Sequence, residues 1–260
     1  MDLGLKGRSA LITGASKGIG LSVAKFLAAE GCALHLVARS RTDLEAARDS
    51  IQKQHGVQVA VHSMNLAERG RAKELAATCP GVDILVNNAG SIPRGSVEEI
   101  DEDRWRHAWD LKVFGYINMS REFFRLMKAR GSGVIINVIG NGGEALDANY
   151  IAGGAGNAAL MAFTRALGGQ SASVGVRVVG VNPGPVGTER LIGLMQQAAQ
   201  TRFGDPSRWR ELEKGFPFGR AATVEEIAAT VALLASDLSS YTTGTIITID
   251  GGMTNRGSLI

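Results

Sequence analysis

The stretch ALITGASKGIG, residues 10–20, decides the fold of this chain. An apolar run at residues 10–12 leads into the glycines Gly14, Gly18 and Gly20, and a helix-like run over residues 21–29 follows them. In a strand–turn–helix unit such glycines let the backbone approach a phosphate, and the helix N-terminus presents free N–H groups to the negative charge. Because the strand and the helix that this motif needs both flank it, the pattern predicts a site for a dinucleotide pyrophosphate.

Composition and charge exclude several classes of protein. The chain has 260 residues, of which 45% are hydrophobic and 20% charged, as is typical of one globular α/β domain. The net charge of +3 comes from scattered Lys and Arg, so we expect no nucleic-acid partner. Cys32 and Cys79 are too far apart for a disulfide scaffold, and the four histidines show no metal-ligand spacing, so we expect no metal. With no apolar run of ~18 residues and no signal-peptide pattern, we expect a cytoplasmic protein without a membrane partner.

Apolar runs alternate with helix-like runs along the chain. Such alternation predicts a doubly wound parallel sheet with helices on both faces, a Rossmann-type α/β fold. Ligands of such sheets bind at the carboxyl ends of the strands, where the glycine turn and the sequence NNAG at residues 87–90 both fall. The expected strands after the first are residues 33–38, 57–63, 83–86, 134–138, 177–181 and 245–249, and the expected early helices are 42–55 and 69–79.

The end of the second strand indicates which dinucleotide binds. NAD-binding folds commonly carry an acid there that binds the ribose 2′-hydroxyl, but this chain has Ala38, followed by Arg39. Together with Lys17 in the glycine loop, Arg39 suits a 2′-phosphate, which predicts NADP(H) as the preferred cofactor, with NAD(H) possible. The alternative is that Arg39 and Arg41 belong to a solvated loop. Asn65 after the third strand could reach the adenine edge, or form a plain turn.

Further motifs carry a resemblance to a known family. NPGPVGT at residues 182–188, FGR at 218–220 and DGG at 250–252 follow the glycine loop and NNAG in order. Over essentially its full length the sequence resembles the short-chain dehydrogenase/reductase family. The resemblance implies a seven-stranded sheet, one dinucleotide-binding oxidoreductase domain over residues 1–260, and a homodimer or homotetramer. The cofactor contacts predicted from motif and resemblance are Gly14, Ser16, Lys17, Gly18, Ile19, Gly20, Arg39, Asn65, Leu66, Asn88, Ala89, Gly90, Lys112, Pro183, Gly184, Val186 and Thr188.

The catalytic residues of the family are absent from their matching positions. The family uses Asn, Ser, Tyr and Lys, and a register without gaps places Lys112, Gly140, Gly153 and Asn157 at these positions. The Tyr and Lys act together, because a neighbouring cation brings the pKa of a phenol down from about 10 towards the working range. Catalysis here therefore requires other residues.

One tyrosine, Tyr150, lies three residues before the family position. Because glycine costs about 1 kcal/mol per residue in a helix, residues 153–156 are predicted to be non-helical. Asn157 then becomes the N-cap of a helix over residues 158–167, and Tyr150 lies on a flexible glycine segment.

This arrangement suggests a relocated catalytic set. Lys112 would project from the neighbouring helix, residues 105–130, and Tyr150 would come in from the loop. Asn141 or Asn157 would supply the amide that replaces the Ser, so that the set stabilises a developing oxyanion beside the nicotinamide. The alternative is that Lys112 is a charged residue near a cleft and Tyr150 a packed aromatic.

Residues 189–218 form a long connection rich in apolar side chains, and in the family such a segment covers the substrate. It predicts a lid over an apolar or ring-containing carbonyl or alcohol, although packing on the core or on a partner subunit explains the pattern equally well. The sequence thus indicates an NADP(H)-dependent oxidoreductase that transfers hydride between the nicotinamide and a carbonyl or secondary alcohol. The alternative is a dinucleotide-binding protein without turnover, a sensor or structural subunit.

Overall fold

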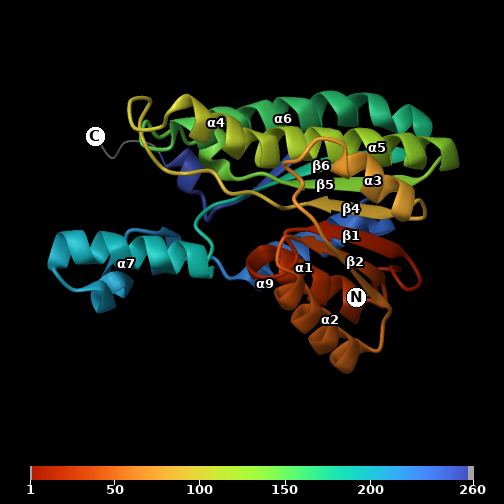
Figure 1. Ribbon diagram of the computed structural model, residues 1–260, viewed down its shortest axis with the longest axis horizontal. Coiled ribbons are helices and arrows are strands. Elements are labelled where there is room, and N and C mark those ends of the chain that lie inside the picture. Colours follow the sequence, from red (N-terminus) through yellow and green to blue (C-terminus); the bar gives the residue numbers. More distant parts are fainter. Residues whose placement is uncertain (1, 257–260) are drawn as a thin grey trace.

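Seven parallel strands form one sheet in the order β3-β2-β1-β4-β5-β6-β7 (Figure 1). The computed structural model describes residues 2–256. The chain begins in the middle of the sheet and winds outward in both directions, so a switch of direction falls between β1 and β4. This confirms the predicted doubly wound, Rossmann-type fold. The strands are β1 (Ser9–Thr13), β2 (Ala33–Ala38), β3 (Val59–Ser63), β4 (Ile84–Asn87), β5 (Gly133–Val138), β6 (Val176–Pro183) and β7 (Ile246–Ile249).

Helices cover both faces of the sheet (Figure 1). On one face, α1 (Gly18–Ala29), α2 (Arg41–His55) and α9 (Val224–Ala235) enclose a core with the strands. On the other face lie α3 (Arg71–Thr78), α5 (Gly115–Arg130) and α6 (Ile151–Ser171). Shorter helical turns are η2 (Asn141–Gly143), η3 (Ala172–Val174), η5 (Pro217–Gly219), η6 (Asp237–Ser239) and η7 (Met253–Asn255).

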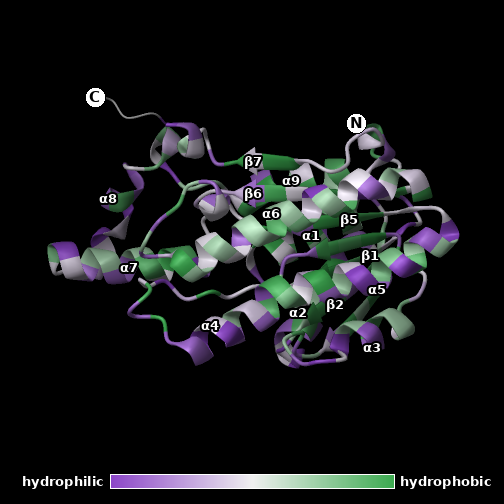
Figure 2. Cartoon of the chain, turned by 90° about the horizontal axis from the view of Figure 1, so that it is seen from above, coloured by the Kyte–Doolittle hydropathy of each residue, from purple (hydrophilic) through white to green (hydrophobic). Residues whose placement is uncertain are grey.

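The central strands are mostly apolar because both of their faces are buried. In β1, Leu11 packs in the core under α3 and α5, whereas Ile12 packs in the core under α1, α2 and α9. Figure 2 shows the hydrophobic colour of the central strands between more hydrophilic helix surfaces. These continuous apolar runs explain why the strands are visible in the sequence.

Helix α6 runs through the glycine segment, so the predicted non-helical stretch at residues 153–156 is wrong. The helix begins at Ile151, which buries Asn157 inside it instead of at an N-cap, and Tyr150 is the residue that precedes the first turn. A Cβ on Gly153 would lie 2.0 Å from Cζ of Tyr150, and one on Gly156 would lie 3.2 Å from Nε1 of Trp109. Close packing of these glycines therefore outweighs their low helix propensity, and the ring of Tyr150 is held against the helix.

The expected helix over residues 105–130 is interrupted. Helix α4 (Glu102–Trp109) passes into a π-helical turn, η1 (Asp110–Phe114), before α5 begins. Such turns inside α-helices are frequent at functional sites. Here the turn contains Lys112, one of the predicted site residues.

The segment predicted as a lid extends from the body of the molecule (Figure 1). It consists of α7 (Glu189–Phe203), η4 (Pro206–Trp209) and α8 (Arg210–Glu213). Met195 is buried, but Leu194 is 37% and Phe218 86% exposed. Arg208 pairs with Glu211 and stacks on Phe203, so its charge is used within the segment. Over the described residues, no helix is both long and apolar enough to cross a membrane.

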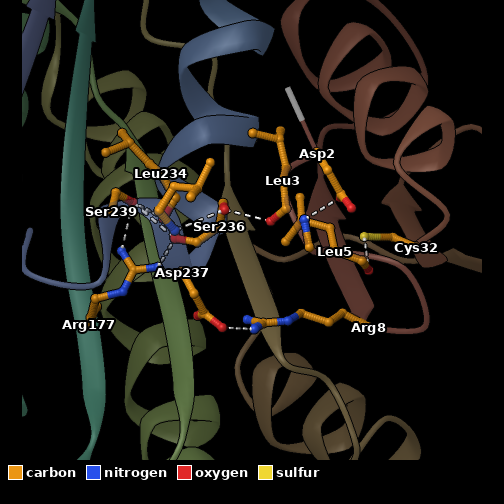
Figure 3. A network of polar contacts seen from close by, with 12 residues as sticks. Asp2, Leu3, Leu5, Arg8, Cys32, Arg177, Leu234, Ser236, Asp237 and Ser239 are labelled. Carbon is orange, nitrogen blue, oxygen red and sulfur yellow. Dashed lines mark hydrogen bonds and ion pairs between the residues drawn. The ribbon is translucent and has the colours of Figure 1, made fainter.

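A polar network joins Leu3 and Arg8 to the segment around η6 and to the start of β6 (Figure 3). Ser236 Oγ donates to the carbonyl of Leu3 at 2.5 Å, and Arg177 Nη2 donates to the carbonyl of Ser236 at 3.0 Å. Arg8 forms an ion pair with Asp237. The network holds the amino ends of the strands, opposite to the carboxyl ends where the glycine turn lies. Both ends of β1 are therefore anchored.

Thr13 and Asn88 join the ends of β1 and β4. Thr13 Oγ1 accepts the backbone N–H groups of Asn88, at 2.9 Å, and of Ala89, at 3.0 Å. In return, Asn88 Nδ2 donates to the carbonyls of Thr13, at 3.1 Å, and Gly14, at 3.3 Å. These bonds hold the glycine turn and the NNAG loop together.

We expect Thr13→Val to lower the free energy of unfolding by about 1–3 kcal/mol, because the isosteric side chain leaves two partly buried N–H donors without an acceptor. Urea denaturation measures this change. The control Thr201→Val, at an exposed position of α7, should stay within about 0.5 kcal/mol of wild type. Equal effects of the two substitutions would contradict the role of Thr13.

Candidate functional site

A cleft of about 900 Å³ opens at the carboxyl ends of β1, β2 and β4. Both glycine motifs line it, together with Thr188 at the start of α7. The predicted cofactor contacts that line this cleft are Gly14, Ser16, Lys17, Gly18, Ile19, Arg39, Leu66, Asn88, Ala89, Gly90 and Thr188.

The glycine turn fits a pyrophosphate. Gly14 has φ +67°, and a Cβ on it would lie 2.9 Å from Asn88 Nδ2; Gly18 has φ +57°. Lys17 precedes α1 and makes no side-chain cap bond, so the N–H groups of the first helical turn face the cleft without a side-chain acceptor. A bound anion supplies such an acceptor, and the helix dipole favours its charge.

Gly20 has a different role from the two glycines before it. A Cβ at this position would lie 2.3 Å from the carbonyl oxygen of Gly14. Gly20 therefore permits close packing of α1 on the turn and is not among the residues that line the cleft.

Two cationic side chains, Arg39 and Lys17, lie where the cofactor ribose is expected. Arg39 is exposed and lines the cleft directly after β2. Lys17 forms a 3.5 Å ion pair with Glu189, and both side chains are mostly exposed. Since exposed pairs are worth about 0–1 kcal/mol, Lys17 can turn to a phosphate at little cost. The acidic side chains that line this cleft, Asp43 and Glu189, both come from helices and not from the end of β2.

The remaining predicted cofactor contacts shape loops. Asn65 accepts the N–H of Ala67 at 3.2 Å, so its side-chain oxygen is used within the turn. A Cβ on Gly184 would lie 2.7 Å from Cβ of Asp250. Glycine at this position therefore allows the loop after Pro183 to pack closely against Asp250. Val186 is buried and pairs with Ala222.

Lys112 is buried between the NNAG loop and the end of β5. Its Nζ donates to the hydroxyl of Tyr116 and to the carbonyl of Val138, each at 2.8 Å, and the Tyr116 hydroxyl donates to the same carbonyl at 2.8 Å. A Cβ on Gly90 would lie 2.6 Å from Cδ of Lys112, so the lysine stem passes directly behind the loop that lines the cleft. An ammonium has three N–H groups, and among the described residues two of them have acceptors.

Burial shifts the pKa values of this pair in opposite directions. Desolvation, with a smaller contribution from the charge of Arg190, lowers the pKa of Lys112 from 10.5 to about 7. Burial raises the pKa of Tyr116 well above its ordinary value, with a smaller contribution from Tyr150. Near neutral pH the lysine therefore exchanges a proton readily while the phenol of Tyr116 stays protonated.

Tyr150 packs against the first turn of α6. Its ring fills the space above Gly153 and packs with Ile92, Ile100 and Ala152. The guanidinium of Arg94 lies 5.7 Å from the ring centroid. Burial raises the pKa of Tyr150, against the lowering effect of Arg190 and Arg94.

The side chain that Lys112 contacts directly is Tyr116, and the predicted convergence of Lys112 and Tyr150 on one substrate stays a prediction. No hydrogen bond joins Lys112 to Tyr150 within residues 2–256. Sequence reasoning missed Tyr116, although its spacing of four residues from Lys112 places both on one helix face.

The two predicted amide donors lie in different surroundings. Asn157 is buried, its Oδ1 has no hydrogen-bond partner among the described residues, and its Nδ2 would lie 3.1 Å from a Cβ on Gly140. The N–H end of this amide thus lies beside the position where the family has Ser. Asn141 Nδ2 instead donates to Asp250 at 3.3 Å and to Thr254 at 3.4 Å.

Comparisons with known proteins place the chain in a family. The family model described as enoyl-(acyl carrier protein) reductase matches residues 14–254. Galactitol 2-dehydrogenase (L-tagatose-forming) of Cereibacter sphaeroides is 34% identical over 253 residues, covering 96% of each chain. The chain therefore belongs to the short-chain dehydrogenase/reductase family of oxidoreductases, which confirms the resemblance and the predicted enzyme class.

Solved structures agree with this assignment. L-sorbose reductase of Gluconobacter frateurii, in complex with NADPH and L-sorbose, is 30% identical with a TM-score of 0.93, over 99% of this chain and 100% of that one. A xylitol dehydrogenase with bound NAD⁺ is 27% identical with a TM-score of 0.86, over 95% and 99% of the two chains. One structural neighbour thus binds NADPH, which carries a ribose 2′-phosphate, and another binds NAD⁺, which lacks it.

The lowered pKa of Lys112 predicts a pH-dependent stability. Below about pH 7 the folded protein must bury a charge that the unfolded chain keeps in water; this destabilisation is relieved as the pH rises from about 7 towards 10.5. We expect Lys112→Met to gain most stability over wild type at about pH 6, and the difference to narrow by about pH 9. Urea denaturation at both pH values tests this, with the exposed Lys128→Met as control. A difference that is constant with pH would refute the shift.

Proposed function

We propose that this chain is an NADP(H)-dependent oxidoreductase that transfers hydride between the nicotinamide and a carbonyl or secondary alcohol. The observation that carries the proposal is the buried Lys112, held by Val138 and Tyr116 directly behind Gly90. The names of the relatives, a galactitol dehydrogenase and a sorbose reductase, support this reaction class.

Lys112 is proposed to move the proton. When bound, the nicotinamide supplies or accepts the hydride. Val138 and Tyr116 fix Nζ and leave one N–H of the ammonium for a substrate oxygen. A pKa of about 7 suits a group that gives a proton in reduction and takes one in oxidation. The amide of Asn157, beside Gly140, is proposed to polarise the carbonyl.

Tyr150 is proposed to act on the substrate side. A pocket of about 330 Å³ is lined by Ile92, Ala108 and Leu194 and by polar side chains that include Arg94, Arg104, His107 and Arg190. Ile92 and Ala108 belong to the cluster against which Tyr150 packs. Arg94 pairs with Asp147, and Arg190 donates to the carbonyl of Ile92, so both charges are partly used within the fold. The apolar part of this lining supports the proposal of an apolar or ring-containing substrate, covered by residues 189–218 as a lid.

A dinucleotide-binding protein without turnover is the competing function. It would bind NADPH and turn over no substrate from a broad panel of carbonyls and alcohols. An ionisable lysine that is buried behind the cleft at the cost of desolvation favours the enzyme. Assembly into a homodimer or homotetramer stays a prediction from the family resemblance.

The proposed preference for NADP(H) depends on Arg39. We expect Arg39→Ala to weaken NADPH binding about 10- to 100-fold, because a charge-assisted bond to phosphate is lost, and to leave NADH binding nearly unchanged. Fluorescence titration with both cofactors measures this. Arg41→Ala is the control, since Arg41 pairs with Glu45 on the surface of α2. Tighter binding of NADH than NADPH by the wild-type protein would overturn the preference.

The proposed proton transfer depends on Lys112. We expect Lys112→Met to lower kcat about 10²- to 10⁴-fold, the usual contribution of a general acid–base group. In the wild type, carbonyl reduction should slow as the pH rises through about 7, because the ammonium loses its proton. Steady-state rates with a substrate found by panel screening test both points.

Three further variants separate the roles of these side chains. Lys128→Met is the control for the loss of a positive charge. Tyr116→Phe tests whether the phenol only positions Nζ of Lys112. If it does, the pH profile of the rate shifts while turnover persists. Tyr150→Phe tests the substrate-side hydroxyl. If Lys112→Met and Tyr150→Phe both leave turnover intact, the relocated catalytic set is wrong.

A further inference from the structure

Three side chains with metal-binding atoms meet away from the dinucleotide cleft. His35 comes from β2, His62 from β3, and Cys79 directly follows the last residue of α3. His35 Nδ1 lies 3.1 Å from His62 Nε2, and Cys79 Sγ lies 3.4 Å from His35 Nδ1 and 3.6 Å from His62 Nε2. None of the three residues lines the cleft.

These distances match the edges of a zinc coordination tetrahedron. Zinc binds imidazole nitrogen at about 2.0–2.1 Å and thiolate sulfur at about 2.3 Å. At tetrahedral angles those bond lengths separate two nitrogens by about 3.3 Å, and a nitrogen from a sulfur by about 3.5 Å. The three side chains therefore stand close to where a zinc ion would require them, with only small shifts.

We propose that His35, His62 and Cys79 form a Zn²⁺ site, with water as the fourth ligand. Both imidazoles are only half-buried, so solvent reaches part of each ring. Two imidazoles and one thiolate are a ligand set that zinc prefers over magnesium or calcium, which take oxygen ligands.

The two imidazoles are in the protonation state that binds metal, whereas the thiol must lose its proton to bind. Burial lowers the pKa of His62, and burial together with His62 lowers the pKa of His35, so both are in the neutral form that binds metal. Burial raises the pKa of Cys79 to about 11, so the thiol holds its proton before the ion arrives. Coordination forms the Zn–S bond and breaks the S–H bond, and that proton passes to solvent.

The positions of the ligands explain why no motif in the sequence indicates this site. They are 27 and 17 residues apart along the chain, on two strands and beyond a helix, so no short ligand spacing connects them. The parallel pairing of β2 with β3 brings the histidines to one face of the sheet, and α3 returns across that face to deliver Cys79. The expectation of no metal rested on spacing alone.

Metal titration of the full-length protein tests the proposal. The protein is treated with a chelator, freed of it, and titrated with Zn²⁺ by calorimetry and with Co²⁺ by absorption spectroscopy. We expect one ion per chain, and a thiolate-to-cobalt charge-transfer band that shows the bond to sulfur. Cys79→Ser should abolish that band and weaken zinc binding more than about 100-fold, beyond the 10- to 100-fold effect of losing an outer-shell partner.

Cys32→Ser is the matched control, because Cys32 is the other buried cysteine and its thiol donates to the carbonyl of Leu5. It should bind zinc and cobalt as the wild type does. Circular dichroism establishes that both variants are folded. A wild-type protein whose cobalt complex lacks the charge-transfer band would overturn the proposal without any variant. Equal zinc affinity in Cys79→Ser and wild type would overturn it as well.

Discussion

The exchange of hydrogen bonds between Thr13 and Asn88 is the constraint on which the site depends. Strands β1 and β4 are neighbours in the sheet but 70 residues apart in sequence, and their carboxyl ends define the switch in winding direction. The Thr13 hydroxyl and the Asn88 amide satisfy four backbone groups between them, so the glycine turn and the NNAG loop form one rigid wall. Gly14 and Gly20 then allow α1 to start close against that wall, which brings its N-terminal N–H groups to the cleft.

A buried lysine behind this wall is the feature that separates the chain from the family pattern. The fold places Lys112 in a π-helical turn, where it meets the last carbonyl of β5 and the phenol of Tyr116. Burying this amine is unfavourable when it is charged, and the two hydrogen bonds offset only part of that cost. The remaining penalty appears as the lowered pKa of Lys112, which is the property that proton transfer near neutral pH requires.

Much of the fold could be predicted, because parallel strands covered on both faces are mostly apolar, as in β4, where three apolar residues precede Asn87. The glycine turn, NNAG and the arginine after β2 were also visible, since each follows a strand directly. The course of α6 was not predicted correctly: Gly153 and Gly156 have low helix propensity, yet they make room for Tyr150 and Trp109, and that packing decides the backbone. Propensity is local, whereas these contacts join separate elements.

Short-range patterns of apolar runs and glycines specify the doubly wound sheet, the family and the dinucleotide cleft, so these could be predicted from the sequence. Which side chains meet depends on the three-dimensional packing. It paired Lys112 with Tyr116, left the amide oxygen of Asn157 without a partner within the described residues, and brought His35 and His62 close to Cys79. The physical reason is that hydrogen bonding, burial and pKa depend on neighbours in space, and strand pairing and helix packing choose those neighbours across long stretches of chain.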